Sequence, residues 1–141
     1  MAVDSSVVIA ALSTWHERHD VAREALEAAL DSGAVIPIPA LHESYSVLTR
    51  LPPPLSLTAA QAAQMLRSLT GARLVTLDAD WADLDGWAAA GVTGGLVYDA
   101  RILACARRGG VTRLLTFNRR HFEQLDLSGM EVVVPGGALP G

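Results

Sequence analysis

Four side chains with oxygen atoms that could bind a cation lie at the ends of predicted strands or near the starts of predicted helices. They are Asp4, Glu43, Asp99 and Asn118. If the fold brings them together, the clustered carboxylates raise one another's pKa values unless a cation compensates the charge. Hard oxygen ligands of this type suit Mg²⁺ or Mn²⁺. Such an ion can lower the pKa of a water and stabilise a pentavalent phosphorus centre, so the implied chemistry is metal-assisted hydrolysis of a phosphodiester.

The elements that must position these side chains alternate between short apolar runs and longer helical stretches, a pattern typical of a layered α/β domain. Five strands are predicted, at Ala2–Val3, Ala34–Ile38, Arg73–Leu77, Arg113–Phe117 and Glu131–Val134. Predicted helices begin at Ser5 or Ser6, at Asp20 (ending at Gly33), at Ala40 (to Leu51), at Thr58 (to Leu69), at Asp80 and at Leu96 (to Arg108). Strands joined by helices should lie parallel, and active groups should then collect beyond their carboxyl ends.

The composition excludes several other chemistries. The chain has 141 residues, half of them hydrophobic and 18% charged, which predicts one folded domain over 1–141. All eleven basic residues are arginines, so no lysine can serve a Walker A motif, a Schiff base or general-base catalysis. The single cysteine excludes a disulfide framework and a cysteine-rich zinc site. Because no apolar run approaches the ~20 residues of a membrane span and no signal peptide is evident, we expect a cytoplasmic protein without membrane contacts.

The net charge is −4, but the positions of the charged residues say more about what the protein could bind than this sum does. Six arginines and no carboxylate lie between Ala100 and His121. Three of them are close in sequence to Asp99 or Asn118 and are candidates for contacts with the phosphates of a phosphodiester substrate. They are Arg101, Arg119 and Arg120, and Arg50 is a further candidate. Because aromatic residues make up only 5% of the chain, we expect a nucleic-acid substrate to be recognised by shape and phosphate geometry rather than by stacking along an extended strand.

Longer segments of the chain resemble the PIN-domain ribonucleases, and specifically the VapC toxins of bacterial VapBC toxin–antitoxin pairs. The matching segments are VDSSVVIAAL (3–12), PALHESYSVLTRLP (39–52), GGLVYDARILACARRGG (94–110) and RLLTFNRRHF (113–122). The resemblance implies a three-layer α/β/α PIN domain with a central, mainly parallel sheet of about five strands. It also implies a homodimeric endoribonuclease that depends on Mg²⁺ or Mn²⁺. A cognate VapB-type antitoxin would neutralise it, and operator DNA would be contacted only through that antitoxin.

The resemblance extends to individual positions. Asp4 and Asp99 match the first and third acidic residues of the family, which are metal ligands, and Glu43 matches the second, a ligand directly or through water. Asn118 stands at the fourth position, where many members carry aspartate. Because an amide brings no negative charge, this departure weakens the case for two metal ions bound at once. Three carboxylates still suffice for one Mg²⁺.

Neighbouring hydroxyls are expected to support the ligands or to cap the following helix. They are Thr116 and one of two serines, and we expect Ser6 rather than Ser5 to point inward. The three tryptophans are predicted to be core or interface residues; they are Trp15, Trp81 and Trp87.

Two other functions are weighed against a nuclease. A catalytically weak PIN-like module, inactivated through Asn118, would act mainly as an antitoxin-binding co-repressor, and growth on induction of the protein alone would distinguish it. A small-molecule phosphatase is disfavoured because the segment Asp4–Ser5–Ser6 lacks the second acid that an acyl-phosphate route would need.

Overall fold

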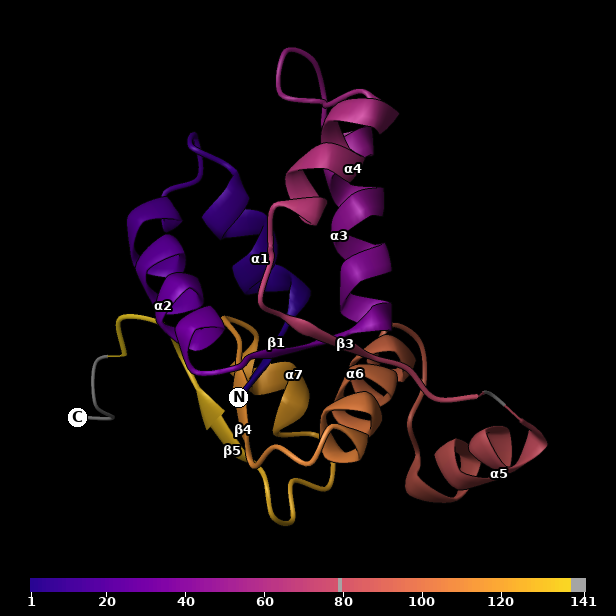
Figure 1. Ribbon diagram of the computed structural model, residues 1–141. Coiled ribbons are helices and arrows are strands. Elements are labelled where there is room, and N and C mark those ends of the chain that lie inside the picture. The colour runs from indigo at the N-terminus through magenta and orange to yellow at the C-terminus, as the bar shows by residue number, and fades with distance from the viewer. Residues whose placement is uncertain (79, 138–141) are drawn as a thin grey trace.

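The computed structural model describes residues 1–78 and 80–137, and within them it contains one five-stranded sheet (Figure 1). The strands are β1 (Ala2–Val3), β2 (Val35–Pro37), β3 (Arg73–Val75), β4 (Arg113–Leu115) and β5 (Glu131–Val133). Their order is β3-β2-β1-β4-β5, and every neighbouring pair is parallel. Ala2 of β1 is aligned with Val35 on one side and Leu114 on the other. β1 is therefore the central strand, with β2 and β3 on one side of it and β4 and β5 on the other.

Seven helices lie in the described residues. They are α1 (Ser5–Leu12), α2 (His19–Asp31), α3 (Ile38–Arg50), α4 (Ala59–Arg67), α5 (Trp81–Ala90), α6 (Leu96–Arg108) and α7 (Arg119–Phe122). The first six form three pairs that connect β1 to β2, β2 to β3 and β3 to β4, while α7 lies between β4 and β5. Parallel strands need crossovers of this length because the chain must return from the end of one strand to the opposite end of the sheet, where the next strand begins.

Successive strand residues point to opposite faces of the sheet, and each face has its own core. Val3 and Leu115 pack in one core with residues of α1, α2 and α4. Their neighbours Ala2 and Leu114 pack in the other with residues of α6 and α7. This arrangement confirms the expected three-layer α/β/α architecture, with a sheet that is parallel throughout.

The boundaries of two helices differ from the prediction for local reasons. β2 ends at Pro37 and α3 begins at Ile38, two residues before Ala40. Proline lacks the N–H that would continue the ladder, and it is well tolerated in the first turn of a helix. α2 begins at His19, so Asp20 lies in its first turn rather than at the N-cap. A carboxylate in that position is favoured by the helix dipole.

The segment after β4 also differs from the prediction. β4 ends at Leu115 rather than Phe117, and a four-residue helix, α7, follows that was not predicted. Such a helix is too short to produce a recognisable hydrophobic period. β3 likewise ends at Val75 rather than Leu77.

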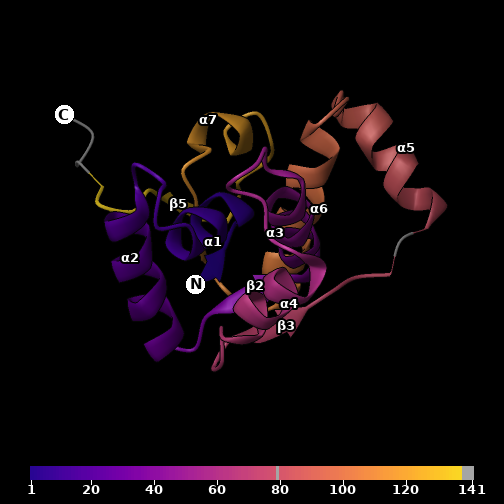
Figure 2. The same cartoon turned by 90° about the horizontal axis from the view of Figure 1, so that it is seen from above.

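Helix α5 stands apart from the rest of the fold in both views (Figures 1 and 2). It begins after the N-cap Asp80, as predicted, but none of its residues Trp81–Ala90 is buried. Trp81 is 81% exposed and Trp15 is 46% exposed, so a core position is excluded for both tryptophans. In the described part of the chain, no helix has the length and apolar character needed to cross a membrane.

Candidate active site

Asp4 lies at the end of the central strand, between the two halves of the sheet that the chain builds in opposite directions. It directly follows β1, whose neighbours β2 and β4 are reached by crossovers in opposite directions. In open parallel sheets this switch point is where ligands bind. Asp4 is only 1% exposed, and although it occupies the N-cap position of α1, its carboxylate makes no capping hydrogen bond. The carboxylate therefore has other partners.

Two hydroxyl groups hold one oxygen of this carboxylate. Ser6 Oγ donates to Asp4 Oδ2 at 2.8 Å, and Thr116 Oγ1 donates to the same oxygen at 2.7 Å. Each hydroxyl also accepts a backbone N–H from the segment after β4. Phe117 donates to Ser6 Oγ at 3.0 Å, and Asn118 donates to Thr116 Oγ1 at 2.9 Å. The network fixes Asp4 against the end of β4 and leaves Oδ1 as its less occupied oxygen.

Glu43 is linked to the same point through Ser5. The Ser5 hydroxyl donates to Glu43 Oε1 at 2.9 Å and lies 3.5 Å from Asp4 Oδ1. A serine has a single proton to donate, so the shorter contact to Glu43 is the stronger one. The expectation that only Ser6 points inward is corrected: two consecutive residues in the first turn of α1 serve two different carboxylates.

Asp99 completes the group from the first turn of α6. Burial is the main reason that its pKa rises to about 6, and the negative charges of Asp4 and Glu43 raise it further. His121 opposes this rise, with its Nδ1 lying 3.7 Å from Asp99 Oδ2. Asp4 at the N-cap of α1, Glu43 on α3 and Asp99 on α6 therefore lie near one another, through the contacts of Ser5 and the effect of the two other charges on Asp99.

Glu43, Asp99 and Asn118 line a cleft of about 940 Å³, whereas the buried Asp4 is not among its lining residues. Three helices contribute to its walls, with Glu43 and Arg50 on α3, Tyr98, Asp99 and Arg101 on α6, and Asn118 and His121 at α7. The α3 residues that line it recur at helical spacing, so one face of that helix forms a wall. The cleft therefore combines an acidic centre with cationic and aromatic groups.

The predicted RNA-contacting arginines occupy different environments. Arg101 lines the cleft, as does Arg50. Arg119 instead donates to the carbonyl of Val132 at 3.0 Å and lies 3.7 Å from Glu123, so its guanidinium is already engaged. Arg120 is exposed and outside the residues that line the cleft.

Two residues of the site, and one contact beside it, were not singled out by the sequence. Ser5 is one of them: the sequence favoured Ser6, although both serines directly follow Asp4 and either hydroxyl could reach a carboxylate. Tyr98, next to Asp99, lines the cleft and is 60% exposed. The guanidinium of Arg18 lies 4.8 Å from the centroid of the Phe117 ring, beside Asn118. This contact joins the loop after α1 to the segment after β4, and no local pattern could have indicated it.

The family can now be assigned. A family model of the PIN domain matches residues 1–127. The chain belongs to the PIN-domain family. Two Mycobacterium tuberculosis proteins, Ribonuclease VapC40 and Ribonuclease VapC27, are each 38% identical to this PIN domain. The alignments cover 94% and 95% of this chain, respectively, and 96% of each relative.

A solved structure supports the same fold for this PIN domain. The crystal structure of Mycobacterium tuberculosis VapC20, described as a toxin that cleaves the sarcin–ricin loop, matches with a TM-score of 0.65. The match covers 90% of this chain and 92% of that one at 24% identity. The expected PIN fold and the resemblance to VapC proteins are therefore confirmed.

Proposed function

We propose that this chain is a metal-dependent endoribonuclease and the toxic component of a type II toxin–antitoxin pair. The observation that carries the proposal is the buried Asp4, held by two hydroxyls close to Glu43 and Asp99, which themselves line a cleft together with Arg50 and Arg101. The names of the two 38%-identical relatives support the same reaction class.

The donor set fits a hard divalent cation. Asp4 keeps Oδ1 comparatively free, and burial together with the charges of Asp4 and Glu43 raises the pKa of Asp99. In the residues that the structure describes, no group of three His, Cys, Asp or Glu side chains is already arranged to hold a metal ion. Mg²⁺ usually keeps several waters and takes only one or two carboxylates directly, so part of this set would act through water. Asp4, Glu43 and Asp99 are the residues that would hold Mg²⁺ or Mn²⁺.

Each residue then has a distinct role. When bound, the cation would acidify a water and offset the charge that develops on the phosphorus. Asp4 is kept in one orientation by its hydroxyl donors, and Ser5 orients Glu43. The backbone of Asn118 is fixed by Thr116, so its amide can orient water or the RNA without adding charge. Arg50 and Arg101 would neutralise phosphates of the bound RNA.

The direct test is incubation of the purified, antitoxin-free protein with total cellular RNA and Mg²⁺, Mn²⁺ or EDTA. We expect discrete fragments with either metal and none with EDTA, together with growth arrest when the protein is induced alone. Co-expression of a cognate VapB-type antitoxin should relieve the arrest, with operator DNA bound only by the complex. Absence of both cleavage and growth arrest would instead favour the antitoxin-binding co-repressor.

The hydroxyl of Thr116 should tune metal affinity. Thr116→Val keeps the volume but removes one donor to Asp4 Oδ2 and the acceptor of the Asn118 N–H. We expect the Mg²⁺ concentration for half-maximal cleavage to rise about 10- to 100-fold. Thr116→Ser should remain close to the wild type, and thermal unfolding would report any loss of stability from the unpaired N–H. An unchanged Mg²⁺ dependence in a folded Thr116→Val protein would contradict this role.

The homodimer is supported by the exposed apolar surface of α5. Because α5 has no buried residue, Trp81→Glu should leave the fold intact and shift the mass measured by light scattering from two 14.9-kDa chains to one. Trp15→Glu, on a separate loop, is the matched control and should remain dimeric. A wild-type monomer would argue against the dimer, and a dimeric Trp81→Glu protein would argue against α5 as its interface.

A further inference from the structure

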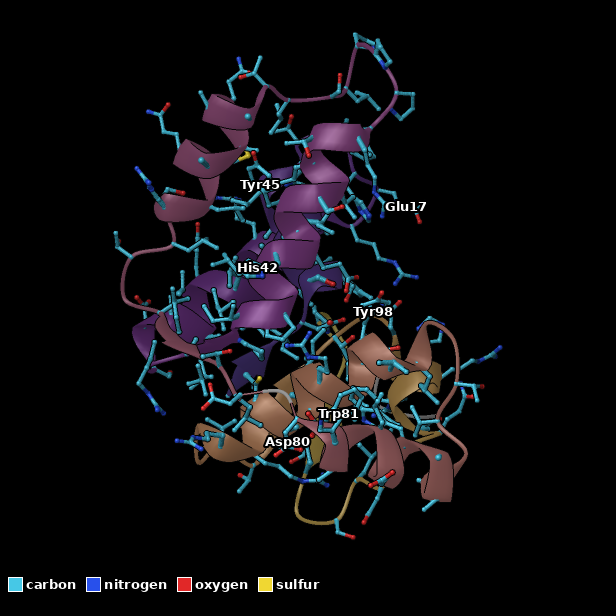
Figure 3. The ribbon with its side chains drawn as sticks, turned by 90° about the vertical axis from the view of Figure 1, so that its right-hand side faces the viewer. Glu17, His42, Tyr45, Asp80, Trp81 and Tyr98 are labelled. Atoms are coloured by element: carbon cyan, nitrogen blue, oxygen red, sulfur yellow. The ribbon has the colours of Figure 1, made fainter. Side chains whose placement is uncertain are left out.

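One aromatic side chain occupies an unusual place in the cleft. Tyr98 is 60% exposed, lines the cleft, and immediately precedes Asp99 in the first turn of α6. Within the described residues, its ring has no aromatic partner and no cation over its face. Figure 3 shows Tyr98 above Trp81 and to the right of His42 of α3. Its face is available to a ligand in the cleft.

The residues around Tyr98 narrow the chemistry of that ligand. Arg101 lies one helical turn further along α6, so its guanidinium shares a face with the Tyr98 ring. Arg50 lies on the facing helix, seven residues or about 10 Å along α3 from Glu43. The cleft thus offers a planar apolar surface, two cations that are separate from the acidic centre, and the acidic centre itself. A nucleotide chain presents the matching groups, which are a flat base and a series of phosphates.

We propose that Tyr98 stacks on an unpaired nucleobase next to the phosphodiester that is cut. The inference rests on the proposed ribonuclease function and assigns Tyr98 as a residue that positions the RNA. A base inside a duplex has both faces covered by its neighbours, and the deep, narrow major groove of A-form RNA excludes side chains. Only a base that is splayed out of the stack can meet the Tyr98 ring beside Asp99. The scarcity of aromatics elsewhere makes this a single stacking position rather than an extended platform.

Binding can be measured without cleavage. A fluorescent hairpin RNA with a seven-nucleotide loop of mixed sequence, and a fully paired duplex of the same stem, are titrated in EDTA at low ionic strength. Tyr98→Ala and Tyr98→Leu should raise the Kd for the hairpin about 5- to 100-fold, while Tyr98→Phe should stay within about twofold. Binding to the duplex should change little in any variant. Replacing the loop bases with abasic sites should abolish the difference between wild type and Tyr98→Ala.

Tyr45 provides the matched control. It is a tyrosine on α3 that is 39% exposed but does not line the cleft, so Tyr45→Ala should bind the hairpin like the wild type. The proposal is overturned if Tyr98→Ala binds the hairpin normally, if hairpin and duplex weaken equally, or if Phe and Leu behave alike. If RNA binding is unchanged but Tyr98→Ala loses neutralisation by the antitoxin, Tyr98 contacts a peptide instead. Because these titrations need no catalysis, they are separable from the cleavage assay, whose failure alone would overturn the ribonuclease function.

Discussion

Replacing Asp4 with asparagine should lower metal-dependent RNA cleavage by roughly a thousandfold or more while the protein stays folded. Asparagine keeps the shape of the side chain, and its amide oxygen can take the Oδ2 position that accepts from Ser6 and Thr116. The variant loses the negative charge that a divalent ion would bind between Asp4, Glu43 and Asp99. Initial rates of RNA cleavage across a Mg²⁺ titration would measure the effect.

Two further variants make this test specific. Asp99→Asn should show a loss of similar size because it removes the second aspartate ligand. Asp31→Asn changes the net charge equally but lies exposed at the end of α2, and it should cleave at the wild-type rate. Circular dichroism and thermal unfolding would confirm that all three variants fold. A folded Asp4→Asn protein that cleaves at the wild-type rate would remove Asp4 from the active site.

Much of the fold follows from patterns that depend on only a few neighbouring residues. The strand starts at Ala2, Arg73, Arg113 and Glu131 were predicted correctly, because short apolar runs between helices have few alternatives in a layered domain. Strand ends were less accurate, since a parallel ladder ends where its partner strand ends. The start of α3 at Ile38 reflects the way prolines are accommodated in a first helical turn. Whether α5 is buried depends on which other elements pack against it, and neighbouring residues in the sequence do not indicate this. The exposure of Trp81 was therefore not predictable.

In the candidate site, too, the placement of the main residues could be predicted from the sequence, whereas their individual contacts could not. The approach of Asp99 to Asp4 follows from topology, because Asp4 ends β1 at the carboxyl edge of the sheet and α6, which leads back to the start of β4, begins at that edge. The partners of individual side chains were not predictable. Ser5 reaches Glu43 across 38 residues, and Arg119 turns back to the carbonyl of Val132. Sequence proximity suggested that Arg119 was an RNA contact, but its guanidinium is occupied by a backbone acceptor that comes from a distant strand.

The acidic centre should also make the metal-free protein less stable as the pH rises. The pKa of Asp99 moves from an ordinary value of 3.8 to about 6 in the folded protein, through burial first and then the charges of Asp4 and Glu43, with His121 opposing. Between these two values the native state binds more protons than the unfolded state, so the free energy of unfolding falls as the pH increases. The loss begins above about pH 4 and is nearly complete above pH 6, where it amounts to at most about 3 kcal/mol.

Asp99→Asn should therefore be more stable than the wild type at pH 8 in EDTA, although it is inactive. Each kcal/mol gained should raise the Tm by about 2 to 4 °C. Toward pH 4 the difference should shrink, because the wild-type carboxyl is then protonated and resembles the amide. Asp31→Asn again serves as the control for a changed net charge. A loss of stability for Asp99→Asn at pH 8, or a difference that does not depend on pH, would contradict the proposed repulsion.

Mg²⁺ should reverse this order. A cation bound to the folded state alone stabilises it by RT ln(1 + [Mg²⁺]/Kd), so the wild type should gain Tm with added Mg²⁺ while Asp99→Asn gains little. Protons compete for the same carboxylate, so the gain in the wild type should decline as the pH falls below about 6. The charge repulsion that destabilises the metal-free fold is then the same property that lets the site bind a divalent ion. A thermal unfolding matrix of pH against Mg²⁺ would measure both effects in one experiment.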